Sequence, residues 1–516
     1  MIPFRKLFST VCVLGLSCTS GVAQDVALTS RDGAIRIEGD LLSYDGEFYR
    51  VDTVYGALTL DGQGVTCAGP GCPDLDAYVA EVTFSGTRRM ADVLVPALIQ
   101  AYVSRNQLSL RREVMSDTRS TFILSDTDRV RARFELRGTT TSEGFADLIA
   151  EEADIALVLR EPNVSEALMA DSSGSGDLVS GRRARVVALD GMVAVTAAGQ
   201  QVKNLSMEQL AATFSGDVVS WADIGGADAP VVLHTPPDTA GLFEAFEERV
   251  LEPYSKSMTP DAVRHASLEE LSDIVAEDSF AIGLTTLSEV GNADPVRISG
   301  SCGFEQAPSI AALKTEDYPL TLPLMLFTPA RRLPLMAREF IEFTASPAAD
   351  LVIRRAGFVD QAITTSDFHT QGDRLAHAIT AVGPEVPLEE LKRLVETLRD
   401  RDRLSTTFRF QVGTRLDVQS SENILRLARA LETGSFDGKS LLFAGFSDSE
   451  GPAAPNMALA LRRARLVMDQ VREAAAAADF DRVQLSVDAF GEALPMACDD
   501  TEWGRAINRR VEVWIR

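Results

Sequence analysis

From residue 79 onward, the chain repeats one pattern: an apolar strand, a loop that contains glycine, and then a helix. An apolar run at 79–84 enters the loop Ser85-Gly86-Thr87, and apolar residues at helical spacing follow that loop. The pattern recurs around 134–150, where Gly138 lies at the start of the loop. Such alternation predicts an α/β sheet that is covered by helices on both faces.

The length of 516 residues indicates several domains, because a single hydrophobic core stops growing at roughly 250–300 residues. Residues 24–78 alternate apolar and polar residues between Asp-Gly turns, which predicts a small all-β domain. The α/β pattern covers 79–360. Strand signals then weaken, and leucines at helical spacing predict a linker with one amphipathic helix over 361–405. Residues 406–516 return to strands and helices and predict a C-terminal α+β domain.

The first 23 residues have the features of an export signal. Arg5 and Lys6 carry positive charge, an apolar run at 7–16 follows, and small residues end at Ala23. A lipoprotein signal that acylates Cys18 is the alternative, although the residues before Cys18 fit that motif poorly. We therefore expect residues 1–23 to be a signal peptide and the mature protein to be periplasmic.

Charge and cysteine content narrow the partners of this chain. The formal net charge of −25 disfavours nucleic acid and anionic membrane surfaces. Export would place the cysteines in an oxidising compartment, where thiols pair. Cys67 and Cys72 enclose a turn-forming tetrapeptide, which favours a local disulfide between them. The sequence leaves the pairing of Cys302 and Cys498 open.

The C-terminal domain contains an ordered series of motifs: Gly445-Phe446-Ser447-Asp448, Asn456, Arg462-Arg463-Ala464 and Asn508-Arg509-Arg510-Val511-Glu512. This series resembles the OmpA-like peptidoglycan-binding domain. The resemblance implies that Asp448 and Arg463, with Asn456 between them, hold the diaminopimelate side chain of the stem peptide. It also implies association with the cell wall and the outer membrane.

The residue chemistry at these positions agrees with that role. A zwitterionic amino-acid end needs an anion for its ammonium group and a forked donor for its carboxylate, and Asp448 and Arg463 supply one of each. The alternative for an aspartate and an arginine on such a unit is a surface salt bridge. We interpret Arg509 and Arg510 mainly as structural partners of the last strand.

The middle domain contains Val-Val-Ala-Leu-Asp-Gly-Met-Val at 186–193, Phe214-Ser215-Gly216 before Trp221, and Ala356-Gly357-Phe358-Val359. These motifs resemble the phosphate-type (PstS-like) solute-binding proteins of ABC importers. The resemblance implies two α/β lobes that close on a ligand, an ABC permease as partner, and oxyanion capture at helix N-termini. The expected ligand-binding residues are Ser85, Thr87, Thr141, Ser142, Arg160 and Thr239.

Two departures from that family leave the ligand open. His234-Thr235-Pro236-Pro237-Asp238 stands where the family commonly has an arginine, and Arg160-Glu161 stands where phosphate-specific members have an acid. Arg160 is a candidate to replace the missing cation, whereas Asp238 would repel anions. Three alternatives remain for the middle domain: it binds phosphate or a related oxyanion, it binds another small solute, or its pocket binds nothing.

Catalytic motifs are lacking in the sequence. It contains four histidines and no HExxH, GxSxG or Walker loop, so we expect no catalytic residue, no metal site and no cofactor. The sequence therefore predicts a periplasmic solute-binding protein for phosphate or a related oxyanion. It would be attached to peptidoglycan by its C-terminal domain. The alternative is a structural or interaction protein of the envelope, whose middle domain contacts another protein and binds no solute.

Overall fold

The computed structural model describes residues 25–75, 77–127, 129–178, 183–381, 383, 385–411 and 413–516. The expected signal peptide at 1–23 lies outside the described residues. The chain forms two compact units, one up to Tyr78 and one from Val79 to Arg516. No helix among the described residues is long and apolar enough to span a bilayer.

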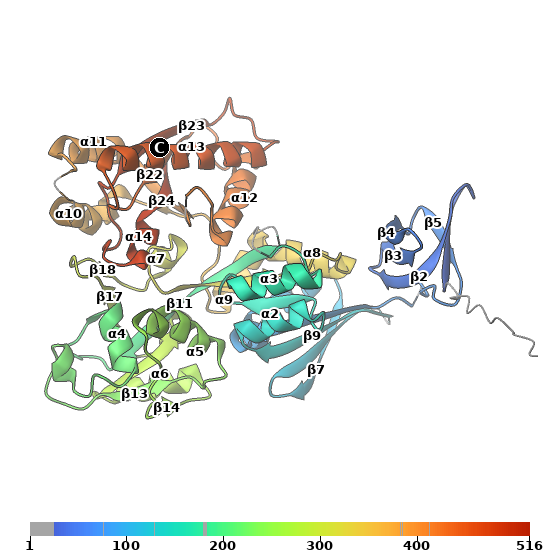
Figure 1. The fold of residues 1–516 in the computed structure, drawn as a ribbon, viewed down its shortest axis with the longest axis horizontal. Helices are drawn as coiled ribbons and strands as arrows, with labels where there is room; N and C mark the ends of the chain where they lie inside the picture. Colours follow the sequence, from blue (N-terminus) through green and yellow to red (C-terminus); the bar gives the residue numbers. More distant parts are fainter. Residues whose placement is uncertain are drawn as a thin grey trace, which may run out of the picture. The chain divides into compact units, whose positions relative to one another are not determined.

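The first unit is all β (blue in Figure 1). Its antiparallel sheet has the order β4-β3-β2-β1-β5, and the core contains Val26, Leu28, Tyr49 and Val51. Cys67 and Cys72 form a disulfide beside this core, with an S–S distance of 1.97 Å. The strands are β1 (Val26–Ser30), β2 (Arg36–Tyr44), β3 (Phe48–Thr53), β4 (Gly56–Asp61) and β5 (Val65–Ala68).

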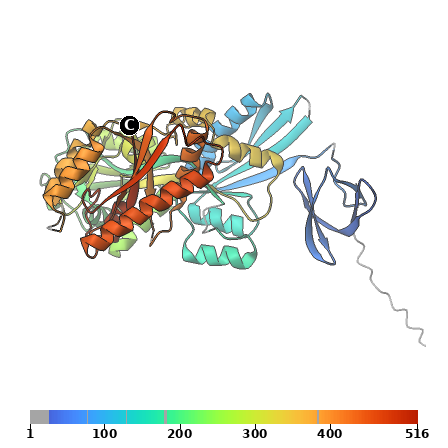
Figure 2. The same ribbon diagram turned by 90° about the horizontal axis from the view of Figure 1, so that it is seen from above.

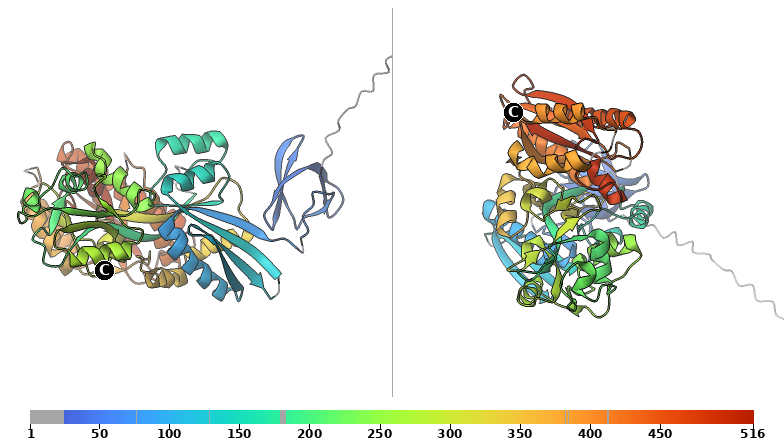
Figure 3. Two further views of the ribbon diagram at one scale, coloured as in Figure 1. Left: turned by 90° about the horizontal axis from the view of Figure 1, so that it is seen from below. Right: turned by 90° about the vertical axis from the view of Figure 1, so that its left-hand side faces the viewer.

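The second unit contains a large mixed sheet that extends through two lobes. Its order is β14-β13-β15-β11-β19-β10-β6-β9-β8-β7, with β16 paired to β11. Strand β11 (Ala184–Thr196) pairs with β19 (Thr321–Phe327) along its first half and with β15 along its second half. These long central strands therefore run from one lobe into the other (Figure 3).

Lobe 1 is defined here as the half of the sheet beyond β19 and the helices that cover it. Its strands are β6 (Ala80–Thr87), β7 (Ser109–Ser116), β8 (Arg119–Asp126), β9 (Arg129–Thr139) and β10 (Ile155–Val158). Its helices are α1 (Val95–Arg105), α2 (Thr141–Ile149), α3 (Val164–Ser173), α8 (Leu335–Thr344) and α9 (Pro347–Arg355), and a π-helical turn, η1 (Met90–Leu94), precedes α1. The strand, loop and helix order expected from residue 79 is thus present.

Lobe 2 is the half that contains β15 (Ala281–Thr286), β13 (Val232–Thr235) and β14 (Val263–Arg264). A separate three-stranded sheet with the order β12-β17-β18 belongs to lobe 2. The remaining elements are β12 (Asn204–Ser206), α4 (Met207–Phe214), α5 (Gly241–Phe246), η3 (Glu247–Leu251), α6 (Leu268–Glu277), β16 (Asp294–Pro295), β17 (Arg297–Ser299), β18 (Glu305–Gln306) and α7 (Ile310–Lys314).

The C-terminal part is a five-stranded sheet with helices on both faces. Its order is β20-β21-β24-β22-β23, in which β22 (Ser440–Phe446) and β23 (Gln484–Gly491) are parallel. Alternate residues of β22 face opposite ways: Leu441 and Phe443 join the core under α12 and α13, whereas Leu442 joins the core under α10 and α11. Figure 2 shows α13 lying along the strands. The other elements are β20 (Thr365–Ser366), α10 (Gly372–Ala381), α11 (Leu388–Leu398), β21 (Asp402–Arg409), α12 (Val418–Glu432), α13 (Ala453–Ala474), α14 (Glu502–Asn508) and β24 (Arg510–Ile515).

The region expected to be a linker is built into this C-terminal part. Strand β20 pairs with the start of β21, and helix α10 accompanies the expected amphipathic helix α11. Strand β21 already begins at Asp402, four residues before the expected boundary at 406. The linker prediction missed β20 because a two-residue strand has too few residues to show a periodic pattern.

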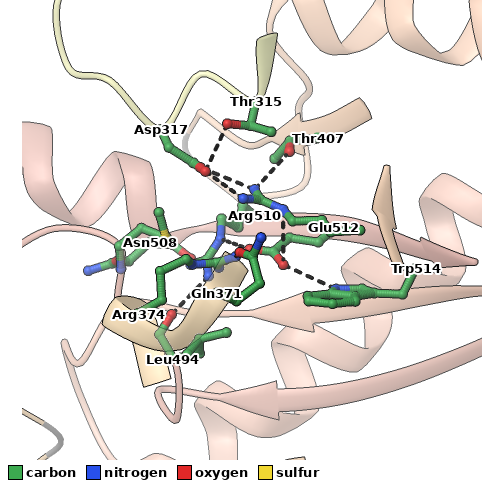
Figure 4. A network of polar contacts seen from close by, with 12 residues as sticks. Thr315, Asp317, Gln371, Arg374, Thr407, Leu494, Asn508, Arg510, Glu512 and Trp514 are labelled. Carbon is green, nitrogen blue, oxygen red and sulfur yellow. Dashed lines mark hydrogen bonds and ion pairs between the residues drawn. The ribbon is translucent and has the colours of Figure 1, made fainter. Parts of the chain in front are cut away.

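Buried ion pairs join the C-terminal part to the two-lobed part within the second unit. Asp317 accepts hydrogen bonds from Arg403 at 2.5 Å and from Arg409 at 3.2 Å. Arg403 also lies 3.3 Å from Glu512, which accepts hydrogen bonds from Arg374 and Arg510. Figure 4 shows Asp317, Arg374, Arg510 and Glu512 within this network. Because each buried charge has an opposite partner, this network holds the two parts in one arrangement.

Candidate functional site

A cleft of about 350 Å³ lies between the two lobes. Thr87, at the end of β6, lines it from lobe 1, and Thr239, just before α5, lines it from lobe 2. These are the two expected ligand residues that the structure brings to this cleft. Asp238 makes an ion pair with Arg264 at 2.8 Å, so its charge is partly compensated.

The hydroxyl of Thr87 is buried and has no hydrogen-bond partner. Its position depends on glycine, because a Cβ on Gly86 would lie 2.0 Å from the carbonyl oxygen of Leu157 on the neighbouring strand. Gly86 also has a φ of +144°, which L side chains rarely adopt. The loop therefore presses closely against the sheet and leaves one unsatisfied hydroxyl at the cleft, where a ligand oxygen would satisfy it.

Arg89 is a cleft residue that the sequence analysis missed. Its guanidinium forms an ion pair with Glu289, donates to Ser288 at 3.2 Å and lies over Phe358, 5.2 Å from the ring centre. The buried Nε atom has no partner. Its position in the sequence could have indicated it, because Arg89 lies two residues beyond Thr87, at the start of the first helix of lobe 1. There it places a cation in the cleft, whereas the loop around His234 has none.

A buried acid also borders the cleft. Burial raises the pKa of Asp190, whose carboxylate accepts hydrogen bonds from the Ser288 hydroxyl at 2.6 Å and from the Gly191 amide at 2.8 Å. His265 also lines the cleft, and its Nε2 atom lies 2.8 Å from Nδ1 of His234. The cleft therefore combines two arginines, Arg88 and Arg89, with hydroxyl groups, carboxyl groups and apolar side chains.

Ser85 does not reach the cleft, contrary to the expectation that it binds ligand. Its side chain is fully buried and donates to Asp147 of α2 at 2.5 Å. The reason is that Asp147 takes the Ser85 hydroxyl, whereas the Thr87 hydroxyl two positions later has no partner. Ser85 therefore positions the helix and does not contact a solute in the cleft.

Thr141 and Ser142 lie at the N-terminus of α2, as expected, but their backbone amides are already occupied. The Glu244 carboxylate of α5 accepts from the Thr141 amide at 2.8 Å and from the Ser142 amide at 3.0 Å. The expectation that these groups are free to bind a solute is wrong for this arrangement. This contact is not visible in the sequence, because Glu244 is separated from Thr141 by 103 positions.

Arg160 is held by acids of this chain and does not line the cleft. Glu166 accepts two of its hydrogen bonds, at 2.7 and 3.0 Å, and Glu248 lies 2.8 Å from its Nε atom. Arg160 instead borders a second cavity of about 210 Å³, together with Glu161, Glu316 and Arg409. It therefore does not replace the cation missing from the loop around His234.

In the C-terminal part, Asp448 and Arg463 are both buried and interact electrostatically. Asp448 follows β22, and Arg463 lies on α13, which packs against that strand. Burial lowers the pKa of Arg463 to about 10, and the Asp448 carboxylate opposes that shift. The two groups that the motif series singled out therefore interact through their charges, and their role in binding stays a prediction.

The Arg463 guanidinium has one donor available. Its Nε and Nη2 atoms donate to the Gly413 carbonyl at 3.1 and 2.8 Å, and the group lies 5.0 Å from the ring centre of Phe410. Its Nη1 atom is buried without a partner. A buried donor without an acceptor is unfavourable, so this atom is suited to a ligand carboxylate.

Asn456 and Arg509 complete the surroundings of Asp448. The Asn456 amide donates to the backbone carbonyls of Asp448 and Glu450, at 3.2 and 3.1 Å, and to the Glu492 carboxylate at 2.8 Å. Asn456 therefore shapes the loop. Arg509, interpreted from sequence as structural, lies 3.0 Å from the Asp448 carboxylate. It is thus part of this site, whereas Arg510 is fully buried and pairs with Glu512.

No group of three or more His, Cys, Asp or Glu side chains suited to a metal ion occurs in the part of the chain that the structure describes. Besides apolar side chains, the two sites contain charged, hydroxyl and backbone groups. Such groups bind and orient polar ligands.

Comparisons with known proteins match the middle of the chain most extensively. Residues 96–348 match the model of the PBP superfamily domain. The phosphate-binding protein PstS of Bacillus subtilis is 25% identical over 160 residues, which cover 31% of this chain and 51% of that relative's length. The middle of the chain is therefore a PBP-like domain with two lobes.

Solved structures show two further similarities. An ABC-type phosphate transport receptor from Vibrio cholerae has 20% identity and a TM-score of 0.42, covering 54% of this chain and 99% of the receptor. The peptidoglycan-associated lipoprotein from Burkholderia pseudomallei has 20% identity and a TM-score of 0.19, covering 22% of this chain and 90% of the lipoprotein.

Proposed function

We propose that this chain is a periplasmic binding protein that is anchored non-covalently to peptidoglycan. Its C-terminal domain holds the diaminopimelate side chain of the stem peptide, and its PBP-like domain binds phosphate or a related small oxyanion. The observation that carries the anchoring role is the buried Arg463 guanidinium, which has an unpartnered donor and lies near Asp448.

The chemistry of the C-terminal site supports the anchoring. Asp448 offers a carboxylate for the ligand ammonium, and Arg463 offers Nη1 for the ligand carboxylate. Arg509 shares Asp448, so a bound ammonium would compete with that ion pair. The motif series at 445–512 resembles the OmpA-like domain and provides independent support.

Binding to purified peptidoglycan tests this role. The mature protein should cosediment with peptidoglycan that contains diaminopimelate. Asp448→Ala and Arg463→Ala should each reduce the bound fraction at least about tenfold, because each substitution removes a charge-assisted contact with the ligand. Arg482→Ala, which removes an exposed cation that pairs with Asp437, is the control and should bind normally. Full retention of both site variants would refute the assignment.

The interlobe cleft supports the solute-binding role. Thr87 contributes an unsatisfied hydroxyl, Arg89 contributes a cation with a free Nε donor, and Thr239 lies across the cleft. The similarity to phosphate-binding proteins of other bacteria favours phosphate among small oxyanions. An ABC permease would be the partner of such a receptor.

Calorimetry with phosphate and sulfate tests the solute. We expect heat that saturates at one anion per chain, and Arg89→Gln should weaken the affinity at least about tenfold because a charge-assisted contact is lost. Arg111→Gln, on an exposed part of β7, should bind as the unmodified protein does. Absence of saturable heat with either anion would refute the oxyanion proposal.

A second function is favoured by a specific observation. The amides of Thr141 and Ser142 are occupied by Glu244, and Arg160 is neutralised by acids of this chain. A domain with these groups satisfied internally would suit an interaction protein of the envelope that binds no solute.

A further inference from the structure

One side chain crosses between the lobes at the N-terminus of α2, where the sequence resemblance implies oxyanion capture. Glu244 belongs to α5 of lobe 2, and its carboxylate accepts hydrogen bonds from two successive backbone amides of α2 in lobe 1. Each carboxylate oxygen takes one amide, at 2.8 and 3.0 Å. The Arg160 guanidinium lies 4.0 Å away from the same carboxylate.

The first turn of α2 has no donor left for another ligand. The Glu143 amide donates to the Thr140 hydroxyl at 3.2 Å, and the Gly144 amide donates to the Thr140 carbonyl at 3.0 Å. With Thr141 and Ser142 bound to Glu244, all four of the first amides are satisfied. The N-terminus of a nine-residue helix, which favours negative charge, is therefore neutralised by a carboxylate of this chain.

A second acid lies beside this contact. Glu248 lies four residues after Glu244, on the η3 segment that continues α5, and pairs with Arg160 at 2.8 Å. Burial raises the pKa of Glu248, Arg160 opposes that shift, and the neighbouring Glu244 and Glu166 add to it. Three carboxylates thus surround one guanidinium, and this local excess of negative charge would repel an entering anion while Glu244 remains in place.

We propose that Glu244 is an internal carboxylate ligand that occupies the anion position at the N-terminus of α2 and holds the two lobes together without solute. An oxyanion reaches these amides only after Glu244 has left them, so solute binding at these amides and loss of this interlobe contact are coupled. The competition with an oxyanion rests on the proposed function, whereas the internal contact does not.

Amide hydrogen exchange in the full mature chain tests the contact directly. In Glu244→Ala, the amides of Thr141 and Ser142 should exchange at least about tenfold faster, because they lose their acceptor. Glu244→Gln keeps one acceptor oxygen and the size of the side chain, and it should give an intermediate rate if the alanine variant folds poorly. Glu247→Ala is the matched control, because Glu247 is three residues away and takes part in none of these contacts.

The outcomes separate this inference from the proposed function. Exchange at Thr141 and Ser142 that is equal in Glu244→Ala, Glu244→Gln and the unmodified protein would overturn the inference. Faster exchange in Glu244→Ala that inorganic phosphate slows again supports both proposals. Faster exchange that saturating phosphate leaves unchanged supports the internal ligand and refutes binding of an oxyanion at these amides, whereas calorimetry with Arg89→Gln tests the oxyanion function in the cleft.

Discussion

At the scale of single residues, Asp317 shows how one carboxylate connects two parts of the molecule. It lies just after α7 in the two-lobed part and accepts hydrogen bonds from Arg403 and Arg409 on β21. Burial by itself raises the pKa of Asp317, but Arg403 and the neighbouring arginines outweigh it and lower the pKa to about 2. The charged form is therefore the stabilising one.

Replacing this carboxylate should destabilise the protein and change its response to acid. We expect Asp317→Asn to lower the free energy of unfolding by about 3 kcal/mol at pH 7, because two buried arginines lose their counter-charge. The stabilisation from Asp317 is present above its ordinary pKa of 3.8 and is lost as the pH falls towards 2. Urea unfolding at pH 7 and thermal unfolding from pH 7 to pH 2 measure both effects.

The control for this prediction is an exposed pair. Asp294 lies 3.1 Å from Lys203, and both side chains are about half exposed. Asp294→Asn should change the free energy of unfolding by less than about 1 kcal/mol, because solvent screens surface ion pairs. An equal effect of the two substitutions would show that Asp317 has no special role.

At the scale of elements, α11 shows what hydrophobic periodicity is able to predict. Its apolar residues recur at helical spacing, and the structure buries Leu394 and Leu398 against β22 and Trp514. Leu388, at the start of the same helix, is 59% exposed. The spacing of the apolar residues indicated the helix. Which of its leucines are buried depends on how the strands of the C-terminal sheet are arranged beneath it.

Shortening a buried leucine on this helix should cost stability. Leu398→Ala should lower the free energy of unfolding by roughly 2–4 kcal/mol, because a fully buried side chain is removed and a cavity remains. Leu388→Ala should change it by less than about 0.5 kcal/mol, since that side chain is mostly exposed. Chemical denaturation of the two variants provides the comparison, and equal effects would contradict the packing of α11.

At the scale of the whole second unit, one disulfide joins distant parts of the chain. Cys302, between β17 and β18 of lobe 2, pairs with Cys498 in the loop after β23, across 196 positions. The same two segments share a hydrogen bond from Gln306 to the Met496 carbonyl at 3.0 Å. This loop also contains Asp499, which accepts a hydrogen bond from Ser449 beside the proposed peptidoglycan site. Lobe 2 and that site are therefore covalently connected.

Removing this disulfide should destabilise the second unit. Replacing Cys302 and Cys498 by serine should lower the free energy of unfolding by roughly 2–5 kcal/mol, because a long loop is released in the unfolded chain. Replacing Cys67 and Cys72, which are five positions apart in the first unit, should leave the melting of the second unit unchanged. Calorimetry of both double variants measures this difference, and an unchanged transition in the first would refute it.

The sequence by itself determined the strand, loop and helix alternation from residue 79, the amphipathic helix α11 and the local pairing of Cys67 with Cys72. It also singled out Asp448 and Arg463. These features are encoded by local spacing, by turn residues or by an ordered motif series, and each is readable within a few tens of residues. Only the tertiary structure decided which polar groups meet across the lobes.

The contact of Glu244 with the amides of Thr141 and Ser142 had no local signature, and neither did the ion pair of Arg89 with Glu289. Their partners are brought by the packing of two lobes, and a glutamate on a helix surface looks the same in sequence whether it faces water or another helix terminus. The spacing of residues along the sequence indicates which side chains share one face of a helix or strand. Which faces of the two lobes come into contact depends on how the lobes pack, and this packing is the sum of many side-chain contacts.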